Sequence, residues 1–195
     1  QSVRKIIECC IKYNINTLTL YAFSTENWKR PLKEVEGLLK LFSESISKES
    51  KKIHSNNIKL KFIGDTSIFT EPLQSKIKEI EKETSRNKRL TLNVALNYGG
   101  RLDIVNSVNS FYQNKKNIKK ITEKNINSGL YTKGQSDVDL LIRTGGQQRM
   151  SNFLLWQSAY AELYFSKNLW PDFDEKVFVD ALYFFQNTER KFGSI

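Results

Sequence analysis

The segment DVDLLIRTGGQQRMSNFLLWQSAYAELYF, Asp137 to Phe165, combines two apolar runs with one polar turn. The run Val138–Ile142 predicts a buried strand, and the glycine pair that follows Arg143 predicts a tight turn. A helix is expected from Ser151, with this serine at its N-cap, and a second strand over 161–165. A strand, a turn and a helix in this order are typical of an α/β fold.

Two arginines of this segment, Arg143 and Arg149, lie on either side of the glycine turn and ahead of Ser151. Backbone amides at a helix start are unpaired and attract anions, and glycine allows close approach of the backbone to a ligand. Glu162, on the next apolar run, is the candidate ligand for a divalent cation. The pattern predicts a phosphate or diphosphate site with a metal, although a plain strand–helix connection with surface ion pairs has the same pattern.

Two further polar clusters follow expected strands. The run Thr17–Phe23 predicts a strand buried on both faces, and it ends in the cluster Ser24–Arg30. The run Leu90–Leu96 predicts another strand, and it ends in Asn97–Arg101. Ligands of open α/β sheets bind beyond the carboxyl ends of the strands, so we expect the clusters to frame one site. In the alternative reading of Ser24–Arg30, its serine or asparagine only caps the next helix.

The remaining apolar periodicity predicts alternating strands and helices along the whole chain. We therefore expect an α/β fold with a mainly parallel central sheet and helices on both faces, formed by residues 1–195 as a single domain. Helices are expected over 2–13 and 31–54, from 71, from 103, and over 121–130 and 175–190, with a further strand over 58–63.

The chain has 195 residues and a formal net charge of +10. This charge suits nucleic acid, anionic lipid headgroups or phosphorylated substrates. Lysines are spread over many faces without a basic and aromatic platform, which argues against a nucleic-acid-binding module but leaves it as an alternative. The two cysteines, Cys9 and Cys10, are neighbours and favour a reducing cytoplasm. No apolar run approaches the roughly 20 residues that cross a bilayer.

These residues resemble the signatures of the cis-prenyltransferases, of the undecaprenyl diphosphate synthase type. The similarity covers essentially the whole chain, with the motifs in the family order. It rests on TLTLYAFSTENWKRP from Thr17, IGD from Ile63, NYGGR from Asn97, DLLIRTGG from Asp139 and WPDFD from Trp170.

The resemblance implies a homodimeric, Mg²⁺-dependent enzyme with the cis-prenyltransferase fold. Such an enzyme condenses isopentenyl diphosphate onto an allylic diphosphate, usually farnesyl diphosphate, and makes a long-chain polyprenyl diphosphate lipid carrier. A long apolar cleft is then expected, lined by the stripe on helix 31–54 with Ala22 and the strand Leu90–Leu96. Contact with a membrane would be peripheral, at its cytoplasmic face.

The resemblance also assigns roles to single residues. Arg143, Arg149 and Ser151 would bind the diphosphate of isopentenyl diphosphate, with the backbone of Met150, and Glu162 would bind Mg²⁺. Asn27 would lie near the proton that is removed, either taking it or orienting the substrate. Around Asn27 the family pattern places substrate-binding positions at Ser24, Thr25, Glu26, Trp28 and Arg30.

The chain departs from the family pattern in three places. The first family motif, an Asp-Gly-Asn loop that holds the allylic diphosphate, is expected upstream of Gln1, so we predict that the polypeptide 1–195 is inactive by itself. Gln148 stands where many relatives carry histidine, and Lys191 where arginine is common. A non-catalytic subunit of a heteromeric cis-prenyltransferase is an alternative, which the arginines, Ser151 and Glu162 argue against.

Overall fold

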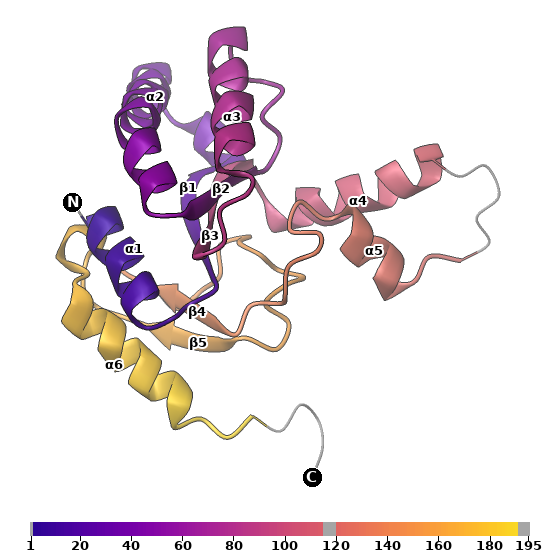
Figure 1. Cartoon of the computed structure of the whole chain (residues 1–195). Helices are drawn as coiled ribbons and strands as arrows, with labels where there is room; N and C mark the ends of the chain where they lie inside the picture. The colour runs from indigo at the N-terminus through magenta and orange to yellow at the C-terminus, as the bar shows by residue number, and fades with distance from the viewer. Residues whose placement is uncertain (1, 115–119, 191–195) are drawn as a thin grey trace.

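Two parallel sheets form the centre of the computed structural model, which describes residues 2–114 and 120–190. The first sheet has the strand order β1-β3-β2, and the second pairs β4 with β5 (Figure 1). Parallel pairing requires a crossover between the paired strands. In the first sheet the crossovers contain helices, whereas turns connect β4 to β5. The strands are β1 (Thr17–Ser24), β2 (Ile58–Ile63), β3 (Leu90–Tyr98), β4 (Leu140–Arg143) and β5 (Glu162–Phe165).

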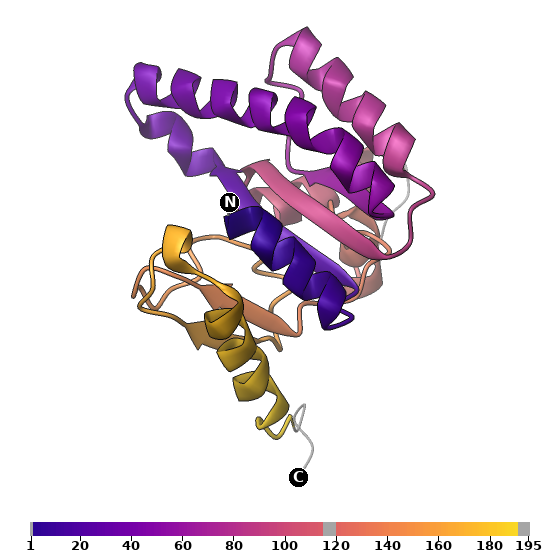
Figure 2. The same cartoon turned by 60° about the vertical axis from the view of Figure 1, so that its left-hand side comes forward.

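Helices cover the sheets from several sides. In Figure 2, α2 and α3 lie over the first sheet, α1 runs alongside β1, and α6 lies against the second sheet. The helices are α1 (Ser2–Lys12), α2 (Leu32–Ser55), α3 (Glu71–Thr84), α4 (Gly100–Asn114), α5 (Glu123–Gly129) and α6 (Glu175–Gln186), with short 3-10 turns η1 (Thr25–Lys29) and η2 (Trp170–Asp172).

Strand β3 is the centre of the core and is buried on both faces. Leu90 and Leu92 face a cluster that includes Ile6 of α1 and Ile80 of α3. Ala95 belongs to a second cluster on the other face, together with residues of the loop after β4. The predicted fold class, a mainly parallel sheet with helices, is confirmed.

The strand β1 differs from the prediction of burial on both faces. Thr17 and Ala22 are exposed and Leu18 and Leu20 are half-buried, so that only Phe23 of this strand is fully buried. The reason is its position, because β1 forms an edge of its sheet instead of its centre.

The other differences concern helix ends. Helix α4 starts at Gly100, three residues earlier than expected, and α6 ends at Gln186 instead of Arg190. In the part of the chain that the structure describes, no helix has the length and apolarity needed to span a bilayer.

Candidate active site

Arg143 is the last residue of β4 and fixes the loop that follows. Its Nη1 donates one hydrogen bond to the carbonyl oxygen of Arg149 and another, of 2.6 Å, to Oγ of Ser151. These three residues, which the sequence predicted as diphosphate ligands, therefore lie together at the carboxyl end of β4. Their role in binding a ligand stays a prediction.

The loop carries positive charge without an acidic partner. Arg149 donates from Nη1 to Oε1 of Gln147, and within the described ranges neither Arg143 nor Arg149 forms an ion pair with a carboxylate. Burial lowers the pKa of the Arg143 guanidinium, and the charge of Arg149 lowers it further. Two unpaired guanidinium groups on one loop favour an anion with several oxygens.

The backbone amides of the glycine turn are paired within the chain. The N–H of Gly145 donates to the carbonyl oxygen of Asn168 at 2.8 Å, and that of Gly146 to Ser166 at 2.9 Å. Glycine is required here for conformation, since φ is +84° at Gly145 and +72° at Gly146.

The helix predicted from Ser151 is also absent, and residues 151–160 form turns. Ser151, Asn152 and Leu154 have φ values of +49°, +61° and +46°. Left-handed residues so close together cannot belong to an α-helix. An anion at this loop would therefore meet arginine side chains and a hydroxyl, and not the N-terminus of a helix.

Asn152 connects the three polar clusters. Its carbonyl oxygen accepts from the N–H of Gly100 at 2.7 Å, and its Oδ1 accepts from the N–H of Arg101 at 2.9 Å. Its Nδ2 donates to Oε1 of Glu26 at 2.8 Å. Burial of Glu26 opposes its ionisation, but hydrogen bonds, chiefly that from Asn152, outweigh burial and lower its pKa. The three clusters therefore meet at this residue, and a common ligand site between them stays a prediction.

The glycines at the start of α4 make this contact sterically possible. A Cβ on Gly99 would lie 2.7 Å from Oγ1 of Thr25 and 2.8 Å from Nδ2 of Asn152. A Cβ on Gly100 would lie 2.8 Å from Cγ of Leu155 and 3.1 Å from the carbonyl oxygen of Asn152. Any larger residue at either position would push the loop after β4 away from the other two clusters.

Asn27 has a structural role in this structure. Its Oδ1 accepts the N–H of Ser24 at 2.8 Å, within the turn η1 that follows β1. Asn27 therefore supports the cap of η1, and its role toward a substrate stays a prediction. An amide oxygen engaged in this way is a poor proton acceptor, whereas its Nδ2 can still donate to a substrate.

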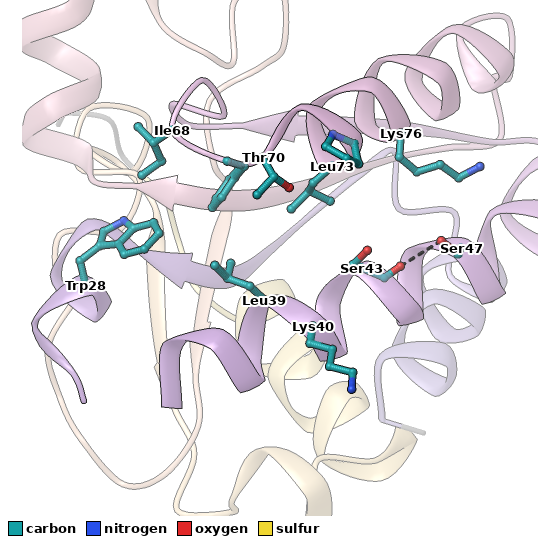
Figure 3. Close-up of a pocket in the computed structure, with 11 residues that line it drawn as sticks. Trp28, Leu39, Lys40, Ser43, Ser47, Ile68, Thr70, Leu73 and Lys76 are labelled. Atoms are coloured by element: carbon teal, nitrogen blue, oxygen red, sulfur yellow. Dashed lines mark hydrogen bonds between the residues drawn. The ribbon is translucent and has the colours of Figure 1, made fainter. Parts of the chain in front are cut away.

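Trp28 separates the polar clusters from an apolar groove. Its Nε1 donates to Oδ1 of Asn97 at 2.9 Å, and its ring packs against Phe23 and Phe69. The groove has a volume of about 590 Å³ and lies between α2 and α3, with Trp28 at one end (Figure 3). Its apolar lining includes Leu39 and Leu73.

The groove confirms only part of the expected lining. The helix stripe contributes Leu39, but Ala22 and strand β3 do not line the groove. Strand β3 is instead buried between the core clusters, where its side chains are already in contact with other parts of the chain.

Two other predicted positions make contacts outside the charged loop. Arg30 forms an exposed ion pair with Glu34 at 2.7 Å, one turn into α2. Met150 is half-buried, and its carbonyl oxygen accepts the N–H of Phe153 at 3.2 Å. Roles of Arg30 and of the Met150 backbone in substrate binding stay predictions.

Glu162 is separated from the charged loop. It is the first residue of β5 and pairs in register with Leu140, whereas Arg143 pairs with Phe165. Three residues along a strand correspond to about 10 Å. Its Oε1 lies 3.9 Å from Nε of Arg190, which also contacts Asp139 at 2.8 Å. A role of Glu162 as a metal ligand stays a prediction.

The buried carboxylate of Asp103 is the centre of a hydrogen-bond network that connects β3, α4 and the loop after β4. The sequence did not predict this role. Its two oxygens accept from the Tyr98 hydroxyl at 2.9 Å, Nε2 of Gln157 at 3.1 Å and the N–H of Tyr131 at 3.0 Å. Burial raises the pKa of Asp103 despite these bonds. The network joins β3, α4 and the loop after β4 behind the polar clusters.

Comparisons with known proteins agree with this architecture. Residues 1–193 match the family model described as "Putative undecaprenyl diphosphate synthase". The chain is 51% identical to a (2E,6E)-farnesyl-diphosphate-specific ditrans,polycis-undecaprenyl-diphosphate synthase of Pasteurella multocida, covering 99% of this chain and 82% of that protein.

Two solved structures share the fold closely. A probable undecaprenyl diphosphate synthase from Campylobacter jejuni superposes with a TM-score of 0.90 at 37% identity, covering 99% of this chain and 90% of that one. Lavandulyl diphosphate synthase from Lavandula x intermedia, solved with dimethylallyl diphosphate, gives a TM-score of 0.93 at 32% identity and covers 99% and 85%.

The fold and the charged loop thus define a prenyltransferase of the α/β type. The chain belongs to the undecaprenyl diphosphate synthase family.

Proposed function

We propose that this protein is a cis-prenyltransferase that condenses isopentenyl diphosphate onto an allylic diphosphate, with farnesyl diphosphate as the starter, to build a long-chain polyprenyl diphosphate. The observation that carries the proposal is the loop on which Arg143, Arg149 and Ser151 converge without an acidic partner. Both substrates have a diphosphate head and a hydrocarbon tail. The charged loop and the groove behind Trp28 match these two parts.

The chemistry places clear demands on such a site. The allylic carbon–oxygen bond breaks and pyrophosphate leaves, a carbon–carbon bond forms with the isopentenyl double bond, and a proton is lost from the isopentenyl unit. Fixed guanidinium groups stabilise the diphosphate oxygens without reorganisation during the reaction. Asn27, whose Nδ2 can donate, is suited to orienting a diphosphate oxygen, which would then be the stronger base.

Mg²⁺ dependence is part of the same proposal. Mg²⁺ is usually held by one or two carboxylates together with substrate phosphates and water. Glu162 and Asp139 offer two carboxylates, but both contact Arg190, and no group of three acidic, histidine or cysteine side chains gathers within residues 2–114 and 120–190. These residues do not form a complete metal site in one chain. A bound Mg²⁺ would neutralise part of the negative charge of the diphosphate.

A homodimer with peripheral membrane contact completes the proposal. The edge strand β5 and helix α6 expose Leu163, Tyr183 and Phe184 on the same part of the molecule. A second copy of the chain would cover these side chains, and this dimer is testable by light scattering. Lys191, whose departure from the family pattern concerns this assembly, lies outside the described residues.

The direct test separates binding from turnover. Binding of isopentenyl diphosphate to the chain 1–195 is measured by calorimetry with and without Mg²⁺, and product formation is measured with farnesyl diphosphate and labelled isopentenyl diphosphate. We expect binding that depends on Arg143 and Arg149, and little or no turnover by 1–195 alone. Absence of diphosphate binding would reject the proposed site, and efficient turnover would reject the prediction of inactivity.

A further inference from the structure

Trp28 is a large side chain with one polar atom, at the end of the groove between α2 and α3. It belongs to the turn η1 and is 39% exposed. Its ring centroid lies 5.2 Å from that of Phe23 and 6.3 Å from that of Phe69. A ring exposed to this extent has more than one rotamer open to it. The 2.9 Å hydrogen bond from its Nε1 to Oδ1 of Asn97 selects one of them.

Asn97 uses both groups of its side-chain amide. Its Oδ1 accepts from Trp28, and its Nδ2 donates to the carbonyl oxygen of Asp65 at 2.8 Å. An indole N–H only donates and a carbonyl oxygen only accepts, so these two partners fix which way the amide points. Asn97 is also buried, which shields both bonds from water. One amide therefore joins η1 to the loop after β2.

The backbone of Asn97 departs from regular strand geometry to make these contacts. Its φ is +46°, and the register between β1 and β3 shifts at the same place. Ala95 and Tyr98 belong to one core cluster, and Leu96 belongs to another. Strict alternation would place Asn97 on the side of Ala95. Its side chain instead reaches Trp28, whose aromatic neighbours belong to the cluster of Leu96. Such an irregularity re-aims a side chain.

The motif IGD, which starts at Ile63, makes the contact with Asp65 possible. At Gly64 φ is +119°, and a Cβ there would lie 2.0 Å from the carbonyl oxygen of Leu96. Glycine therefore lets the end of β2 approach the end of β3 closely. This approach brings the carbonyl oxygen of Asp65 to the amide of Asn97.

The loop after β2 also forms part of the groove. Oδ1 of Asp65 accepts from the N–H and the hydroxyl of Ser67, at 3.0 and 2.6 Å, and so fixes the turn before Phe69. Phe69 and Trp28 both line the groove, with Trp28 at one end (Figure 3). Asn97 is thus bonded to both of the segments that supply these two rings.

The turn η1 connects this end of the groove to the charged loop. Glu26 lies two residues before Trp28 in the turn, and its Oε1 accepts from Nδ2 of Asn152 at 2.8 Å. The turn is therefore bound to the loop after β4 through Glu26 and to β3 through Trp28 and Asn97.

We propose that Asn97 is a positioning residue, which fixes the indole of Trp28 and thereby the shape of the groove end that receives a hydrocarbon tail. The inference rests on the proposed function, because it takes this groove as the site of the tail. Asn97 acts on the tail through Trp28 and the loop after β2. An indole released from Asn97 would rotate about its side-chain bonds and reduce the space for the tail.

The test compares two replacements of Asn97 in the full chain 1–195. Asn97→Gly removes both side-chain hydrogen bonds and adopts the positive φ without strain. Asn97→Asp keeps an acceptor for the indole N–H, and aspartate also tolerates this conformation. The probe is farnesol, which has an apolar tail but no diphosphate, and calorimetry measures its affinity. We expect Asn97→Gly to weaken farnesol binding at least fivefold and Asn97→Asp to stay within twofold of the unchanged chain.

A spectroscopic signal of Trp28 separates positioning from a general loss of stability. The chain is labelled with 5-fluorotryptophan, and Trp28→Phe assigns its resonance among those of the three tryptophans. We expect a narrow resonance in the unchanged chain and in Asn97→Asp, and a shifted resonance at least twofold broader in Asn97→Gly. The control is Leu92→Ala in the core, which should change neither the resonance nor the farnesol affinity while it is folded.

A double-mutant cycle keeps the test decisive if Asn97→Gly is poorly stable. Trp28→Phe keeps an aromatic ring without the N–H and should weaken farnesol binding as Asn97→Gly does. If Asn97 acts through Trp28, adding Asn97→Gly to Trp28→Phe should weaken binding less than twofold further. Additive losses would overturn the proposal.

The other outcomes are equally clear. An unchanged Trp28 resonance or farnesol affinity in Asn97→Gly would overturn the proposal, and so would equal losses in the two replacements of Asn97. No binding of farnesol by the unchanged chain would overturn it as well. Isopentenyl diphosphate is titrated against the same samples. Loss of its binding with farnesol binding intact would reject the proposed diphosphate site and would not affect the role of Asn97.

Discussion

The two sheets of this molecule are held together in different ways. In the first, β3 is paired on both sides and buried by helices, so its geometry comes from backbone ladders and apolar packing. In the second, two strands of four residues each carry the charged loop, which is positioned by side-chain hydrogen bonds from Arg143, Asn152 and Gln157. We therefore expect the first sheet to contribute most of the free energy of unfolding. The polar contacts of the second sheet should mainly position the proposed diphosphate-binding loop.

The largest effect should come from the core of the first sheet. Leu92→Ala, at a residue that is 2% exposed, should lower the free energy of unfolding by about 2–5 kcal/mol, the usual cost of such a cavity. Urea denaturation measures this change. Diphosphate affinity should be unchanged at temperatures where the variant is folded, and a parallel loss of affinity would contradict the division between the sheets.

The reverse behaviour is expected at the charged loop. Arg143→Ala should weaken isopentenyl diphosphate binding about 10- to 100-fold, because a hydrogen bond to a charged group contributes about 1.5–3 kcal/mol. Calorimetry measures the affinity. The control is Arg4→Ala, which removes a surface ion pair with Glu49 that is remote from the loop and should change affinity less than twofold. Equal losses in the two variants would mean that only overall charge matters.

Asp103 tests the connection between the two regions. The carboxylate of Asp103 accepts three hydrogen bonds. In Asp103→Asn, the amide N–H₂ would point at one of these three donors, and that hydrogen bond would be lost. We therefore expect the free energy of unfolding to fall by about 1–3 kcal/mol. Diphosphate binding should weaken as well, because the loop after β4 is held through Gln157. Burial raises the pKa of Asp103, so its contribution to stability falls as pH rises through that pKa, and the variant should lose this dependence.

The smallest effect is expected for Glu26→Gln. The pKa of Glu26 is lowered by its hydrogen bonds, so its contribution to stability is present above its unfolded pKa, about 4.3, and is lost as pH falls through the folded value. Thermal unfolding between pH 3 and 7 should show a shallower acid loss in the variant than in the parent chain. Identical pH profiles would show that the bond from Asn152 has no energetic weight.

The sequence was sufficient for the first sheet and for the three polar clusters that meet in the structure. Periodicity predicts α1, α2, α3 and the strands β1, β2 and β3 to within a few residues, because their apolar patterns are long and regular. The glycine pairs and polar strand ends likewise located the clusters that meet at Asn152.

The conformation of residues 151–160 could not be predicted in this way. Their composition is compatible with a helix, but contacts from Gly100, Arg101 and Glu26 hold Asn152 at a positive φ, and these partners are distant in sequence. The prediction that β1 is buried on both faces was also wrong, because a local sequence pattern does not reveal whether a neighbouring strand is present. Pairing of the Gly145 and Gly146 amides could not be predicted for the same reason, since Ser166 and Asn168 follow the next strand, β5.

The close packing of Gly99 and Gly100 on Asn152 has a consequence for how this protein tolerates sequence change. Because a methyl group at position 99 would meet both Thr25 and Asn152, an alanine there requires that each of these side chains moves or is replaced by a smaller one. A randomised library should therefore recover alanine at position 99 mainly together with changes at positions 25 and 152, and single replacements should be rare among functional clones.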